Sequence, residues 1–332
     1  MLGGKVKLKV CMLVLATILF TGCGTQNETK VIKMAHGLDV KHPVHQSMVH
    51  MAERLAQLSA GSMRVDIYPS GQLGSERELI ELLQIGSLGM TKVSASPLEG
   101  FVPQMKVFSL PYLFEDNDHF WRVLKTHVGK SLLLAGQPFL IRGLGYYDAG
   151  SRSFYSTKKQ VKSPSDLSGM KIRVMNSQTA VEMINVMGGS ATPVSFGELY
   201  TALQQGVVDG AENNPPSFHL SRHYEVSKYY TIDEHTSIPD VILISKYVWD
   251  SLDQQQQQWL QQATDESVDF QRKLWKRATK EAMSVVKEAG VEVLYPDKSQ
   301  FLDSVADVYK GETNEAVKEM VLKIEAMRSS NE

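Results

Sequence analysis

The sequence is poor in cysteine, with only two among its 332 residues. Cys11 lies within an apolar N-terminal run and Cys23 follows just after it, so the chain beyond Cys23 contains none. A disulfide framework and a thiolate metal site are therefore excluded for that part of the protein. The roughly 300 residues that follow are enough for a large core or for two lobes, and the fold must depend on burying apolar surface.

The sequence also lacks the signatures of several function classes. Its 35 Lys and Arg residues balance 37 Asp and Glu residues, and they form no basic stripe of the kind that binds nucleic acid. It contains neither the G-x-x-x-x-G-K-[ST] phosphate loop nor the H-E-x-x-H zinc motif. Beyond the N-terminus, no apolar run approaches the about 20 residues of a membrane span. We therefore expect no cofactor, no nucleic-acid partner and no ATP site.

The N-terminus has the pattern of an export signal. A cluster of lysines precedes a short apolar run over residues 10–20, which is typical of a secretory signal peptide. The run ends in FTGC, which resembles a bacterial lipobox with Phe in place of the more usual Leu. We expect a lipoprotein signal peptide over 1–22, lipidation of Cys23 and a polar tether over 23–30. The alternative is ordinary signal cleavage with an unmodified Cys23.

Strands alternate with helices along most of the chain, and this order predicts a layered α/β fold. One block of such units ends near Gly150, a second runs to about Asp240, and the rest returns to both, which predicts two lobes. A single long helical tract is expected over Ser251–Ala289. The elements expected in the first block are strands over 31–35, 63–68 and 89–94 and helices over 44–59 and 76–85.

The stretch from Gly169 to Phe218 is the most informative part of the sequence. It is expected to form a strand over 171–175, a helix over about 178–187, a second helix from Ser195 and a short strand over 207–209. A glutamate three residues after Ser195 gives the spacing of a capping box. This order predicts a β-α-α-β unit.

Polar side chains accompany both strands of that unit. Arg173 lies in the first strand, and Glu212 and Asn213 follow the second. Ligands of open α/β sheets bind beyond the carboxyl ends of the strands. An arginine there can hold a carboxylate bidentately, and an asparagine can both donate to and accept from hydroxyls. The alternative is that Arg173 is a surface arginine and Asn213 a turn residue.

Three motifs together give the chain a family resemblance. They are DLSGMKIRVMNS over 166–177, TPVSFGELYTALQQGVVDGAEN over 192–213 and FSLPYLFEDNDHF over 108–120. The sequence resembles the extracytoplasmic solute receptors of tripartite ATP-independent periplasmic (TRAP) transporters, of the C4-dicarboxylate-receptor type. The resemblance extends over nearly all of the chain after residue 30.

The resemblance implies a two-lobe periplasmic solute-binding protein with discontinuous lobes, hinge strands and a long helix spanning both lobes. It places lobe I at 31–150 plus about 241–275, and lobe II at 151–240 plus about 276–332. In such a receptor the lobes close around the ligand, and the closed form is recognised by the membrane permease. The protein is then exported and is not an enzyme.

The resemblance also implies the site residues. Arg173 is expected to anchor a ligand carboxylate with Arg152 assisting, while Asn213 contacts the ligand and Phe196 packs on it. Glu76 matches a position that accepts hydrogen bonds from ligand hydroxyls. The alternative for Glu76 is an acid favoured by the helix macrodipole.

Three further residues are candidates for ligand contact. Ser94 is expected to end a strand that faces the cleft. His36 follows the first strand and His235 lies in a later one; for each, the alternative is a structural histidine. Glu212 is expected to support the arginines rather than to touch the ligand.

The motifs VVDGAENNPPSF and YYTIDEHT resemble the sugar-acid branch of these receptors, which binds hexuronates such as D-glucuronate and D-galacturonate. C4-dicarboxylates and diketogulonate are the alternatives. A rival from another class is an enzyme with His36, Glu76 and Asp209 as an acid–base set, although no nucleophile elbow, metal cluster or cofactor fingerprint accompanies them. A second rival is the receptor of an ATP-driven importer.

Overall fold

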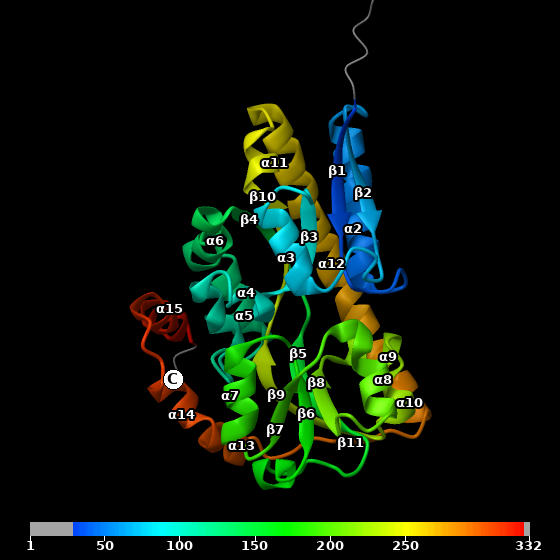
Figure 1. Ribbon diagram of the computed structural model, residues 1–332, viewed down its shortest axis with the longest axis vertical. Helices are drawn as coiled ribbons and strands as arrows, with labels where there is room; N and C mark the ends of the chain where they lie inside the picture. Colours follow the sequence, from blue (N-terminus) through cyan, green and yellow to red (C-terminus); the bar gives the residue numbers. More distant parts are fainter. Residues whose placement is uncertain (1–28, 329–332) are drawn as a thin grey trace, which may run out of the picture.

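The computed structural model describes residues 29–328, which form two β-sheets of five and six strands with helices packed around them (Figure 1). The predicted signal peptide, Cys23 and most of the predicted tether lie outside the described residues. Within 29–328, no helix combines the length and the apolar character needed to cross a membrane. The predicted α/β fold with two lobes is confirmed. We call the five-stranded sheet with its helices the first lobe and the six-stranded sheet with its helices the second lobe.

The sheet of the first lobe has the strand order β2-β1-β3-β10-β4. The strands β1, β2 and β3 are parallel, whereas β10 runs antiparallel to both of its neighbours. Every residue of β3 and β10 is buried, as expected for central strands covered on both faces. The bounds are β1 Lys30–Ala35, β2 Met63–Tyr68, β3 Met90–Ser94, β4 Ile141–Tyr147 and β10 Asp240–Ser245.

The sheet of the second lobe has the strand order β11-β9-β5-β8-β6-β7. The strand β5 pairs antiparallel with β8 and β9, while β6 is parallel to β7 and β8. The bounds are β5 Ser151–Ser156, β6 Lys171–Val174, β7 Ser190–Pro193, β8 Gly210–Asn213, β9 Tyr229–Ser237 and β11 Glu292–Leu294.

The predicted strand at 207–209 is displaced in the structure to β8, Gly210–Asn213. Val207 is about half exposed, and the carboxylate of Asp209 caps the ladder by accepting from the Lys171 amide. Gly210 allows the close pairing with β5, because a Cβ there would lie 2.6 Å from the Tyr155 carbonyl oxygen. Glu212 and Asn213 therefore lie within a buried strand rather than beyond its end.

Helices pack on both sheets, and the longer ones bury an apolar stripe. In α2, the predicted inward side chains Met48, Met51 and Leu55 are fully buried. The helices of the first lobe are α2 Pro43–Leu58, α3 Glu76–Gln84, α4 Ala95–Leu98, η2 Pro103–Ser109, α5 Asn117–Leu124, α6 His127–Leu134, η3 Gln137–Phe139 and α11 Lys246–Asp250. Those of the second lobe are η4 Pro164–Leu167, α7 Gln178–Val186, η5 Phe196–Glu198, α8 Leu199–Gln204, α9 Pro215–Leu220 and α10 His223–Val226.

One long helix, α12 Gln254–Glu288, runs along both lobes (Figure 1). It begins at Asp253 with a capping box, and its 35 residues extend about 52 Å at 1.5 Å per residue. It packs against α2 and β4 of the first lobe and against α9 of the second. The predicted lobe-spanning helix is confirmed, and the separate short helix α11 precedes the predicted tract.

The chain crosses between the lobes several times. The segment 148–150 joins β4 to β5, and the segment 238–239 joins β9 to β10. After β11, the helices α13 Ser299–Ser304 and α14 Ala306–Lys310 pack on the second lobe. The last helix, α15 Glu315–Glu325, packs instead against η2 and α6 of the first lobe (Figure 1). The range 276–332 expected for lobe II therefore includes a helix whose contacts are with the first lobe.

Candidate functional site

A cleft of about 540 Å³ lies between the two lobes, a volume suited to a small ligand. Six of the eight side chains predicted to contact a ligand line it. They are Glu76, Ser94, Arg152, Arg173, Phe196 and Asn213. These six residues come from elements of both lobes, and Trp275 of the long helix α12 also lines the cleft.

A larger cavity of about 1090 Å³ contains none of the eight predicted residues. Ser151 and Ser153 of β5 line this cavity, whereas Arg152 between them lines the cleft. Successive side chains of a strand point to opposite faces, so the larger cavity lies behind the sheet, on the side away from the cleft. Trp275 of α12 lines both spaces and separates them.

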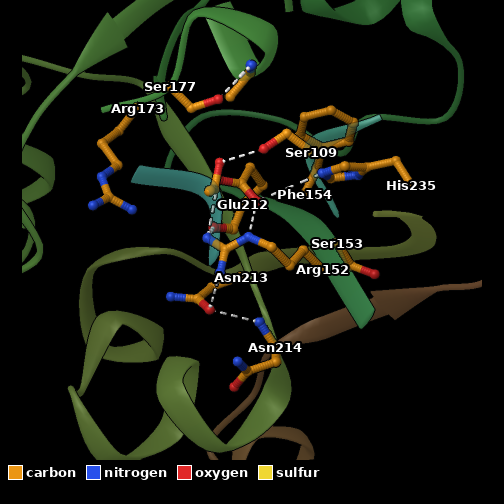
Figure 2. Close-up of polar contacts among 12 residues, drawn as sticks. Ser109, Arg152, Ser153, Phe154, Arg173, Ser177, Glu212, Asn213, Asn214 and His235 are labelled. Carbon is orange, nitrogen blue, oxygen red and sulfur yellow. Dashed lines mark hydrogen bonds and ion pairs between the residues drawn. The ribbon is translucent and has the colours of Figure 1, made fainter. Parts of the chain in front are cut away.

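Four of the five N–H groups of Arg152 donate to protein groups (Figure 2). Its Nε and Nη2 donate to the two carboxylate oxygens of Glu212, the second at 3.0 Å, and Nη2 also donates to the Glu212 carbonyl oxygen at 2.6 Å. Its Nη1 donates to Asn213 Oδ1 at 2.9 Å. Burial opposes ionisation of Glu212, but the charge and hydrogen bonds of Arg152 and His235 outweigh it and lower the Glu212 pKa to about 2. Glu212 therefore supports an arginine, as predicted.

His235 lies behind this pair and is fully buried. Its Nδ1 is 2.7 Å from Asp233 Oδ2, and its Nε2 is 3.6 Å from Glu212 Oε2. Burial favours the neutral ring, yet Asp233 and Glu212 together raise the pKa of His235 to about 9. The imidazolium stacks on Phe154 with ring centroids 4.5 Å apart (Figure 2). The structure thus places His235 beneath the Arg152–Glu212 pair and not among the residues that line the cleft.

Arg173 of β6 is only 2% exposed, and it lacks the acidic partner that Arg152 has. Its Nε donates to the Val194 carbonyl oxygen at 2.8 Å, but its buried Nη1 has no hydrogen-bond partner. Among residues 29–328, no carboxylate lies within ion-pair distance of it, and its guanidinium lies apart from the Arg152–Glu212 group (Figure 2). Burial, with a further contribution from Arg152, lowers the pKa of Arg173. A buried cation without a counter-charge is costly, and an anionic ligand would remove that cost.

Asn213 and Phe196 complete the wall of the second lobe. Asn213 Oδ1 accepts from Arg152 and from the Asn214 amide at 2.9 Å, so the orientation of its side chain is fixed. Its amide group remains to donate to a ligand. Phe196 is half-buried and meets the ring of His223 edge-on at 5.6 Å, which leaves the other part of its ring at the cleft.

The wall of the first lobe carries a cluster of charges. Glu76 is the first residue of α3, and its Oε1 accepts from the Ser94 amide at 2.9 Å. Lys92 Nζ lies 2.8 Å from Asp240 Oδ1 and 3.3 Å from Glu76 Oε1. Burial opposes the charge on Lys92, but the two acids outweigh it and raise the Lys92 pKa. Lys92 and Asp240 were not predicted as site residues, although a lysine inside the apolar strand MTKVS is a signal that could have found them.

The two histidines near the first strand have different surroundings. His36 is fully buried; its Nε2 lies 3.0 Å from His45 Nδ1, and its Nδ1 accepts from the Leu38 amide at 3.1 Å. It is not among the residues that line the cleft. His42, which was not predicted, does line the cleft. Its Nε2 lies 3.4 Å from Oγ of Ser217 in the second lobe. Trp275 also lines the cleft and was not predicted, because its position depends on how α12 crosses the lobes.

The residues of the rival acid–base set do not converge. Of the three, only Glu76 lines the cleft. Asp209 instead pairs with Lys158 and accepts from the Lys171 amide. Across residues 29–328, no group of three or more His, Cys, Asp or Glu side chains could hold a metal ion.

The sequence matches the family of bacterial extracellular solute-binding proteins, family 7 (DctP), over residues 34–316. The chain belongs to the DctP family. A TRAP periplasmic solute-binding protein of Bradyrhizobium sp. BTAi1, crystallised with α/β-D-galacturonate, is 40% identical to this chain with a TM-score of 0.87. The match covers 90% of this chain and 100% of that one. A TRAP periplasmic solute-binding protein of Anaerococcus prevotii with bound α/β-D-glucuronate is 35% identical with a TM-score of 0.88, over 90% and 98% of the two chains. The Salmonella typhimurium protein YiiZ is 38% identical over 86% of this chain and 87% of its own.

DctP proteins are extracytoplasmic binding proteins of TRAP transporters, and this chain is such a solute receptor. Family members bind and deliver solutes rather than transform them. The predicted receptor class is thereby confirmed.

Proposed function

We propose that this DctP receptor captures a hexuronate such as D-glucuronate or D-galacturonate, and that Arg173 anchors the ligand carboxylate. The observation that carries the proposal is the buried guanidinium of Arg173, which lines the cleft without an acidic partner among the described residues. A carboxylate can accept two parallel hydrogen bonds from such a group. Arg152 can assist with one N–H of its Nη1, because its other donors are occupied by Glu212 and Asn213.

The remaining walls favour a sugar acid over a simple dicarboxylate. Asn213, Ser94 and Glu76 line the cleft and offer donors and acceptors suited to hydroxyls. Arg173 is the one cation of the described cleft that lacks a protein carboxylate. The bound galacturonate and glucuronate of the similar structures support the same ligand class. C4-dicarboxylates and diketogulonate remain the alternatives.

Capture is expected to occur by closure of the lobes around the ligand, followed by delivery to the membrane subunits of the transporter. Among the hydrogen bonds that join the lobes in residues 29–328, two connect the facing sides of the first and second lobes. They are the contact between His42 and Ser217 and the 3.0 Å bond from the Thr179 amide to Glu99 Oε1. We further propose that the receptor is exported and held at the outer face of the membrane by lipidation of Cys23.

Calorimetry with D-glucuronate tests the anchor. Arg173→Met is expected to raise the Kd at least about thirtyfold, since removing one partner of a buried charge pair costs about 2–5 kcal/mol or more. Lys171→Met, which removes an exposed cation from the same strand, is the matched control and should bind like the wild type. Wild-type affinity in Arg173→Met would overturn the assignment.

NMR of the ligand after incubation with the protein should show the ligand unchanged, whereas a product would indicate an enzyme.

A further inference from the structure

We propose that Lys92 and Asp240, together with Glu76, form a subsite that recognises sugar hydroxyls and rejects a second carboxylate. The three side chains line the cleft on the first lobe, whereas Arg173 lines it on the second. The inference rests on the proposed function, because it assigns the end of the ligand that Arg173 does not hold.

The subsite is built into three separate elements. Lys92 lies in β3, Asp240 begins β10 where that strand enters the first lobe, and Glu76 begins α3. The pairing of Asp240 with Ser94 in the β3–β10 ladder fixes the spacing between the first two. Lys92 and Asp240 are buried, so their positions do not depend on flexible surface side chains.

Hydrogen-bonding groups remain free in this cluster. The Lys92 ammonium has three N–H groups, and Asp240 and Glu76 use two of them. Each carboxylate uses one oxygen, Asp240 Oδ1 and Glu76 Oε1, and the other oxygen of each has no partner within residues 29–328. The cluster can therefore donate one hydrogen bond and accept several, which is the pattern that hydroxyl groups satisfy.

The charge of the cluster sets its selectivity. Burial raises the pKa of Asp240, while the charge of Lys92 opposes that shift. With both acids ionised, one ammonium between two carboxylates leaves a net negative charge. Burial and the charge of Lys92 lower the pKa of His36 to about 3 and lower that of His42, so these neighbouring rings are neutral and do not offset it. A second ligand carboxylate would meet this negative cluster in a partly dry cleft, where repulsion between like charges is weakly screened. A neutral hydroxyl would meet no such penalty.

The test compares ligands that differ only at the end remote from the anchor. D-glucuronate is the primary probe. L-gulonate and D-glucarate are open-chain acids with the same internal hydroxyls, and D-glucarate has a second carboxylate where L-gulonate has a CH₂OH group. The variants are Asp240→Asn and Glu76→Gln, which remove one negative charge while keeping the shape of each side chain. Glu234→Gln, at an exposed acid of the adjoining strand β9, is the control.

Both cleft variants are expected to raise the Kd of D-glucuronate about tenfold or more, as for lost hydrogen bonds to charged groups. Both should also lower the ratio of the D-glucarate Kd to the L-gulonate Kd, because the cluster becomes neutral. Thermal unfolding of each variant without ligand shows whether the fold is kept, and Glu76→Gln at a helix start decides the outcome if Asp240→Asn is unstable.

Wild-type affinity for D-glucuronate in both variants, or an unchanged preference between the two open-chain acids, would overturn this inference and leave the anchor at Arg173 intact. Failure of the wild-type protein to bind D-glucuronate would instead overturn the proposed function and this inference with it.

Discussion

Arg152 and Arg173 are both at least nine-tenths buried in the same sheet, but their surroundings are opposite. Arg152 gives its donors to Glu212 and Asn213, whereas Arg173 bonds one carbonyl oxygen and keeps a buried N–H without a partner. The first is a neutralised pair that shapes the cleft wall, and the second is a cation without a protein counter-ion. The role of a buried charge therefore follows from its partners rather than from its residue type.

The largest expected effect separates the two arginines by stability. Arg152→Met should lower the free energy of unfolding by about 3–5 kcal/mol, because Glu212 is left as a buried charge without its main partner. Arg173→Met should cost at most about 1 kcal/mol, since only the hydrogen bond to Val194 is lost. Urea unfolding of both variants without ligand measures the difference.

Ligand affinity also distinguishes the two arginines. Arg173→Met should lose binding while remaining folded, and the double variant Arg152→Met with Glu212→Gln should recover much of the stability lost by Arg152→Met alone. Equal destabilisation by the two single variants would mean that the two arginines are not distinct in the way their partners indicate.

A smaller effect concerns how the free energy of unfolding depends on pH through His235, which lies behind the Arg152–Glu212 pair. The folded-state pKa of His235 is raised to about 9 from 6.5, so its contribution to stability is complete below pH 6.5 and is lost as pH rises through 9. The free energy of unfolding should therefore fall between pH 6.5 and 9, and His235→Gln should flatten that fall. Urea unfolding at pH 6.5 and pH 9 measures it.

Two other buried histidines, His36 and His223, do not interfere with this measurement. His36 and His223 have pKa values lowered to about 3 by burial, so their contributions are complete above pH 6.5 and are lost only as pH falls toward 3. A His235→Gln variant with the wild-type slope between pH 6.5 and 9 would show that His235 is neutral in the folded protein.

The sequence predicted the parts of this molecule that depend on local pattern. The alternation of strands and helices, the long helix and the residue types at the cleft could be inferred, because periodicity and motif are local properties. The same motifs predicted that both arginines serve the ligand. Only the three-dimensional pairing of β5 with β8 brings Glu212 beside Arg152 and so distinguishes them.

The residues that were missed depend on contacts between distant segments. Lys92 meets Asp240 because β3 and β10 are neighbours, although 148 positions separate them in the chain. His235 was predicted at the cleft, but strand β9 turns its ring toward Asp233 and Phe154. The packing of α15 on the first lobe has the same origin, since an amphipathic helix does not specify which lobe its apolar face covers.

The smallest expected effect tests whether a contact between the lobes adds to the ligand affinity that Arg173 provides. Glu99 of the first lobe accepts from the Thr179 amide at the start of α7 in the second, at 3.0 Å. A carboxylate at a helix N-terminus contributes about 0.3–1 kcal/mol. Glu99→Ala should therefore raise the Kd of D-glucuronate about two- to fivefold by calorimetry. Glu99→Gln keeps an acceptor oxygen and should lie between this variant and the wild type. An unchanged Kd in Glu99→Ala would mean that this contact does not contribute to the closed form.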